Sequence, residues 1–213
     1  LLAKNTGQCH SMPLLFLILA EELETEAFWC FSPSHSFIKF QDKQNRWYNI
    51  ELTQGAVVTD DFYMNSGFIK SKAIQTGIYL NPRTMKQTIA HMLNDLSAYY
   101  ISRYGYDHFI EENSNLVLRY SPSDLTAYQH YANICTVQAQ YVIDACGRPP
   151  KEQLPEYPQA HRLFKKMLQS YEKIDSLGYE EMPAEIYHNW LKQVDKAKTL
   201  PENQPSPIIQ IKK

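Results

Sequence analysis

Residues 7–23 have the sequence GQCHSMPLLFLILAEEL, and this stretch decides how the rest of the chain is interpreted. Pro13 suits the first turn of a helix, where its missing N–H costs no hydrogen bond. The residues after it are apolar on all sides of a helical wheel, which predicts a helix that is buried all round. Cys9 therefore stands at the start of a predicted central helix.

The position of Cys9 favours a reactive thiol. The unpaired backbone N–H groups and the dipole at the start of a helix stabilise a thiolate, which is the nucleophilic form. The backbone N–H of Cys9 can also hold the oxyanion of an acyl intermediate. Because a free cysteine is more often a small buried apolar residue, the reactive interpretation needs a matching base elsewhere in the chain.

The composition is that of an ordinary globular protein. The chain has 213 residues, of which 44% are hydrophobic and 21% are charged, with a net charge of −2. This balance offers no basic surface for nucleic acid, and the apolar run 14–20 is too short for a membrane span. The chain opens at Leu1 rather than at a methionine, so we expect an upstream portion that carries any targeting signal, and no localisation is assigned.

The cysteines do not have the spacing of a metal site. No CxxC pair and no Cys/His zinc pattern occurs, so neither a metal nor an organic cofactor is expected. The four cysteines are Cys9, Cys30, Cys135 and Cys146.

An antiparallel hairpin is predicted after the first helix. Residues 27–31 read as a buried aromatic strand, and residues 34–40 and 46–53 read as two strands joined by a polar turn. Strand alternation places three residues of the first hairpin strand on one face: His35, Phe37 and Lys39. It places three residues of the partner strand together in the same way: Trp47, Asn49 and Glu51.

Thiol catalysis requires this combination of side chains. A histidine takes the proton of the thiol and later protonates the leaving group, while a carboxylate or an amide fixes its tautomer. Cys9 is the candidate nucleophile and His35 the candidate base. Glu51 and Asn49 are the two candidates for the orienting residue, because they share a strand face.

Three short motifs resemble the core of bacterial transglutaminase-like proteins, which have a papain-like fold. They are GQC at 7–9, SHSFIK at 34–39 and WYNIELT at 47–53. In that family, the residue that orients the catalytic histidine is usually an aspartate in a W-x-x-x-D-P-T pattern. Glu51 stands at this position after Trp47, with Leu52 in place of the proline, and Asn49 remains its competitor.

The resemblance implies a function and roles for the residues. Cys9 would attack the carbonyl, His35 would move the proton, and Gln8 is a candidate second donor to the oxyanion. The implied activity is thiol-dependent acyl transfer on a protein or peptide substrate, with a peptidase or amidase favoured over a cross-linking enzyme. The alternative is a non-catalytic scaffold with a degenerate core of this kind, which binds a protein partner through its helices.

The pattern changes to helical spacing near Met85. Residues 93–106 have the spacing of a tetratricopeptide repeat with a turn at Gly105, which predicts a repeat module that can bind a protein partner. The expected fold is α+β, with a papain-like, transglutaminase-like core followed by tetratricopeptide-like helices. We predict a core at 1–84 that lacks its N-terminal part, a helical module at 85–200 and an extended tail at 201–213.

Overall fold

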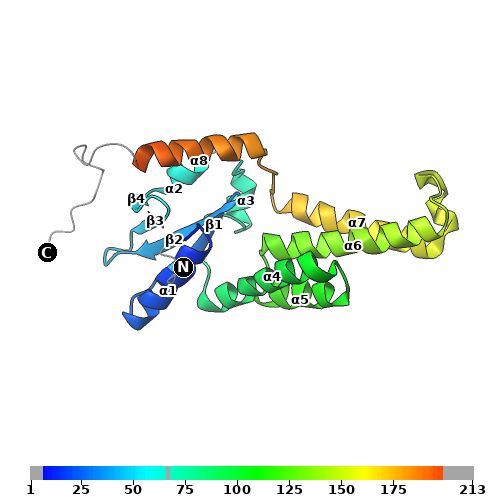
Figure 1. Ribbon diagram of the computed structural model, residues 1–213, viewed down its shortest axis with the longest axis horizontal. Coiled ribbons are helices and arrows are strands. Elements are labelled where there is room, and N and C mark those ends of the chain that lie inside the picture. The colour runs from blue at the N-terminus through cyan, green and yellow to red at the C-terminus, as the bar shows by residue number, and fades with distance from the viewer. Residues whose placement is uncertain (1–6, 66–67, 199–213) are drawn as a thin grey trace. The chain divides into compact units, whose positions relative to one another are not determined.

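The protein has a mixed α and β structure. The computed structural model describes residues 7–65 and 68–198, and their side chains except those of residues 191 and 193–198. These residues form helices and a single four-stranded antiparallel sheet (Figure 1), so the predicted α+β class is confirmed. None of the helices in these two ranges combines the length and apolar character needed to cross a bilayer.

The described chain divides into two compact units. The first unit contains the described residues up to Ile69, the segment Tyr79–Pro82 and the described residues from Glu180 onward. Its elements are α1 (Ser11–Glu22), β1 (Phe28–Ser32), β2 (His35–Gln41), β3 (Trp47–Glu51), β4 (Ala56–Val58), α2 (Asp60–Asn65) and α8 (Ala184–Lys198). The second unit has α3 (Ser71–Gln75), α4 (Met85–Tyr104), α5 (His108–Tyr120), α6 (Leu125–Ala145), the 3-10 helix η1 (Lys151–Glu156) and α7 (Pro158–Ser176).

The sheet is a meander with the order β1-β2-β3-β4. Strands β1 and β2 pair through Ser32 and His35 across a tight turn, in which Ser34 has a φ of 55°. Strands β2 and β3 are antiparallel, with Ile38 opposite Ile50, so the predicted hairpin is confirmed. With this register, the side chains of His35 and Glu51 lie on the same face of the sheet.

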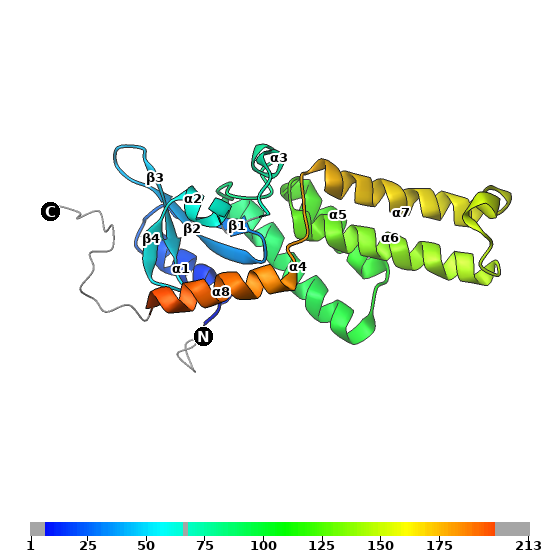
Figure 2. The ribbon, with the colours of Figure 1, turned by 90° about the horizontal axis from the view of Figure 1, so that it is seen from above.

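The two faces of the sheet are covered by different helices. On one face, Leu17 of α1 forms a core with Trp29 and Ile38. On the other face, the ring of Tyr63 in α2 stacks on Phe37 with centroids 3.9 Å apart. Figure 1 shows α1 on one side of the sheet and α8 on the side of α2, and in Figure 2, which is seen from above, α8 lies in front of α1.

The first helix is less buried than its sequence predicted. Leu17 is 6% exposed, whereas Ile18 is 58% and Leu23 is 75% exposed. The prediction of a helix buried all round is therefore wrong for the described structure. The reason is that α1 packs on the sheet along the side that carries Leu17, and its apolar outer residues have no such layer over them.

The division of the chain differs from the predicted boundaries at both ends of the helical module. We expected a core at 1–84 and one helical module at 85–200, but Lys70–Ile78 belongs to the second unit and α8 belongs to the first. The physical reason is aromatic packing, because Trp190 of α8 lies against His35 and Phe62 of that unit. The predicted extended tail at 201–213 lies outside the described residues.

The second unit is built from long helices with defined ends. Helix α4 begins with a capping box, in which Thr84 and Gln87 each bond the other's backbone N–H. It ends at Gly105, whose φ of 79° allows the chain to turn into α5 at the predicted place. Helix α6 packs against both α5 and α7.

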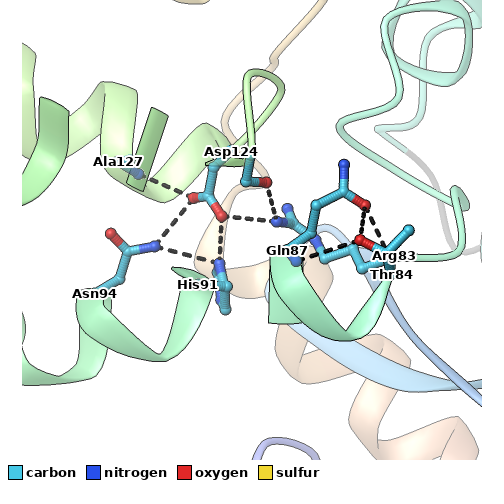
Figure 3. Close-up of polar contacts among 8 residues, drawn as sticks. Arg83, Thr84, Gln87, His91, Asn94, Asp124 and Ala127 are labelled. Carbon is cyan, nitrogen blue, oxygen red and sulfur yellow. Dashed lines mark hydrogen bonds and ion pairs between the residues drawn. The ribbon is translucent and has the colours of Figure 1, made fainter. Parts of the chain in front are cut away.

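A buried polar network joins α4 to the start of α6 (Figure 3). Asp124 is fully buried, and its Oδ2 lies 2.7 Å from both Nη1 of Arg83 and Nδ1 of His91. Its Oδ1 accepts from Nδ2 of Asn94 at 3.0 Å and from the backbone N–H of Ala127 at 3.1 Å. One carboxylate therefore caps α6 and neutralises a buried arginine, which fixes α6 relative to α4.

Candidate catalytic site

Cys9 lies in the turn that leads into α1. The backbone N–H of Met12 donates to the carbonyl of Gln8 at 3.0 Å, so this turn is continuous with the helix. The hydroxyl of Ser36 in β2 donates to the carbonyl oxygen of Cys9 at 2.6 Å. This bond ties the cysteine to the strand residue next to His35.

His35 and Glu51 form a buried pair across the sheet. Nε2 of His35 lies 2.7 Å from Oε2 of Glu51, and the two side chains are 2% and 0% exposed. The strand alternation that the sequence predicts brings these two groups together on one face of β2 and β3. Nδ1 is the ring nitrogen that remains for exchange of a proton with the thiol.

Glu51 is held in place by three further hydrogen bonds. Oε1 accepts from the backbone N–H of Thr53 at 3.0 Å and also from its hydroxyl. Oε2 accepts from the hydroxyl of Tyr63 at 3.0 Å. A buried carboxylate with this many donors stays ionised and has little freedom to rotate.

The thiol and the imidazole change each other's ionisation. Burial opposes ionisation of Cys9, but the contact with His35 and the backbone N–H of Ser36 outweigh it and lower the pKa of the thiol. Burial likewise opposes protonation of His35, but Cys9 and Glu51 together raise its pKa to about 9. Both shifts favour the thiolate–imidazolium form of the pair.

The thiol of Cys9 and the ring of His35 interact without a hydrogen bond of full geometry between them. Among the described residues, Nδ1 of His35 is buried and has no partner with full hydrogen-bond geometry. The interaction with Cys9 nevertheless contributes to both pKa shifts. Catalytic hydrogen bonds are often long or poorly aligned before a substrate binds, and this geometry is of that kind.

The structure separates the two candidates for the orienting residue. Nδ2 of Asn49 donates to Oδ1 of Asp60 at 2.8 Å, and the same carboxylate lies 2.9 Å from Nζ of Lys39. Lys39 also donates to the carbonyl of Leu80 at 3.1 Å. Asn49 therefore ties β3 to α2, and Glu51 is the residue bonded to His35.

The role of Gln8 as a second donor to the oxyanion stays a prediction. The residue is exposed, and its backbone N–H donates to the hydroxyl of Ser11 at 3.1 Å. The backbone N–H of Gln8 is therefore used within the turn that leads into α1.

Three residues of the site were not identified from the sequence. Ser36 holds the backbone of Cys9, Tyr63 donates to Glu51, and Trp190 packs against His35 with ring centroids 4.8 Å apart. Ser36 was detectable in principle as the neighbour of His35 on a strand. Trp190 had no such signal, because it lies 155 positions after His35 in a helix that was assigned to another module.

No group of three or more His, Cys, Asp or Glu side chains among the described residues is arranged to hold a metal ion. Comparisons of the chain with protein-family models, with curated proteins and with solved structures found no match.

Proposed function

We propose that the protein is a thiol-dependent amidase or peptidase that uses Cys9 as its nucleophile, His35 as its acid and base and Glu51 as the residue that orients His35. The observation that carries this proposal is the buried 2.7 Å contact between His35 and Glu51, on a ring that also interacts with Cys9. A histidine held between a carboxylate and a thiol is the arrangement that cysteine hydrolases require.

In the first step, the thiolate of Cys9 attacks the carbonyl carbon of an amide. A C–S bond forms, and the oxyanion that develops is held by backbone N–H groups, of which the N–H of Cys9 is one. The imidazolium of His35 then gives its proton to the leaving nitrogen as the C–N bond breaks. The products of this step are a free amine and a thioester on Cys9.

In the second step, neutral His35 takes a proton from water, and the resulting hydroxide equivalent attacks the thioester. The C–S bond breaks, a carboxylic acid leaves, and the proton on His35 restores the ion pair with Cys9. The carboxylate of Glu51 stabilises the imidazolium in both steps.

The resemblance to bacterial transglutaminase-like proteins supports the same assignment. The GQC, SHSFIK and WYNIELT motifs contribute the three proposed groups in the order of that family. We therefore propose a papain-like, transglutaminase-like core for the first unit and tetratricopeptide-like helices for the second. Hydrolysis is preferred over cross-linking on the strength of this resemblance, and a protein or peptide is the proposed substrate.

Direct detection of the acyl-enzyme tests this function. A small activated ester such as p-nitrophenyl acetate should transfer its acyl group to Cys9, and peptide mass mapping after an acid quench should find the group there. Loss of the nucleophile in Cys9→Ser or of the base in His35→Ala should reduce that labelling by a factor on the order of 10² or more.

The other cysteines serve as internal controls. Cys146 is partly exposed but lies in the second unit, whereas Cys30 and Cys135 are buried. Acylation that is equal at Cys9 and Cys146, or that is unchanged in His35→Ala, would contradict the proposed function.

A further inference from the structure

Helix α8 closes one side of the proposed catalytic histidine. The indole of Trp190 lies edge-on to His35, with ring centroids 4.8 Å apart, and 6.3 Å from the ring of Phe62. Tyr63 stacks near the same histidine at 6.1 Å. Trp190 is only 8% exposed, so these aromatic rings exclude water from the His35 side chain.

A second aromatic residue of α8 packs on Trp190. Tyr187 stands one turn before Trp190 and stacks against it, with centroids 6.2 Å apart. Burial raises the pKa of the Tyr187 hydroxyl, and the negative charge of Cys9 raises it further. Trp190 thus packs on His35, and Tyr187 extends the aromatic surface of the same helix.

Acyl transfer needs space at the same positions. The carbonyl carbon must reach the sulfur of Cys9, and the leaving nitrogen must come within reach of the proton on His35. A bulky acyl group and its leaving group therefore compete with Trp190, and with the helix that carries it, for the space beside His35. A small reagent needs much less of it.

We propose that α8 is a built-in cover of the catalytic thiol, in which Tyr187 and Trp190 restrict access to Cys9 until a peptide substrate displaces the helix. This proposal rests on the proposed acyl-transfer function and adds its regulation. The cover selects by size, because it admits small acyl donors and delays large ones.

Alkylation of the full-length protein with a small and a bulky reagent tests the cover. Iodoacetamide and fluorescein maleimide are compared, and peptide mapping gives the rate at each cysteine. Trp190→Ala and, independently, Tyr187→Ala should raise the rate of the bulky reagent at Cys9 by about tenfold or more, and that of iodoacetamide by less. His188→Ala, an exposed position of the same helix, should match the unmodified protein.

Two outcomes would overturn the cover. One is that the ratio of the Cys9 alkylation rates with the bulky and the small reagent is unchanged in both variants. The other is that Cys9 is alkylated more slowly in the variants, which would mean that Trp190 supports His35 instead of covering the thiol. Cys30 is fully buried, so alkylation of Cys30 in one variant would show that this variant has lost its fold. The proposal is then judged from the other of the two variants. Failure of the proposed function gives a different result, because His35→Ala would then label Cys9 as fast as the unmodified protein with either reagent.

Discussion

Replacing Glu51 with glutamine is expected to slow acyl transfer by a factor on the order of 10² or more while the fold is retained. The carboxylate lies 2.7 Å from Nε2 of His35 and contributes to the pKa of about 9 of that ring. A neutral amide stabilises the imidazolium less, so His35 gives up its proton at lower pH. The alkaline limit of activity, expected near pH 9 in the unmodified protein, should therefore move to lower pH in Glu51→Gln. Initial rates over a pH series, with a thermal melt as a check of folding, measure both effects.

Asn49→Ala is the matched control for this change, because Asn49 lies on the same strand face and bonds Asp60 rather than His35. It should cost less than about tenfold in rate and leave the alkaline limit in place. A larger loss of rate in Asn49→Ala than in Glu51→Gln would assign the orienting role to the amide and leave Glu51 as a structural carboxylate.

The largest expected effect on stability is at Asp124 in the second unit. Its carboxylate is fully buried and bonds Arg83, His91 and Asn94 (Figure 3). Asp124→Ala leaves the buried guanidinium of Arg83 without this charge and removes the cap of α6. We expect the free energy of unfolding to fall by about 3–5 kcal/mol, measured by urea denaturation followed through the helical circular dichroism signal.

Asp144→Ala is the control for this prediction, because Asp144 pairs with Arg148 on the exposed end of α6. A surface pair of this kind contributes little to stability, because solvent screens it. Similar small losses in the two variants would show that the Asp124 network adds nothing beyond an ordinary surface pair.

The part of the site that depends on local periodicity could be predicted. Alternation along two paired strands was enough to place His35 and Glu51 on one face, and the structure pairs them. Alternation alone could not choose between Glu51 and Asn49, since both point the same way. Which of the two bonds His35 depends on Asp60 at the start of α2, because its carboxylate accepts a hydrogen bond from the amide of Asn49.

The features that depend on distant packing could not be predicted. The apolar residues on every side of α1 suggested that the helix is buried all round. Which side is covered depends on the elements that pack around the helix, and Ile18 remains exposed. Helix α8 has an ordinary amphipathic pattern that fits a helical module equally well. Its packing of Trp190 onto His35 joins two segments far apart in sequence, and no local pattern encodes that contact.

The pH dependence of Cys9 alkylation tests the central claim most directly. The rate constant at Cys9 is followed by mass mapping from pH 5 to 10 and normalised to its plateau, with N-acetylcysteine as a reference thiol. Because the contact with His35 outweighs burial and lowers the pKa of Cys9, the midpoint should lie below that of the reference thiol. It should rise in His35→Ala. A midpoint at or above that of the reference thiol, unchanged by His35→Ala, would contradict the ion pair and with it the proposed catalytic role of Cys9.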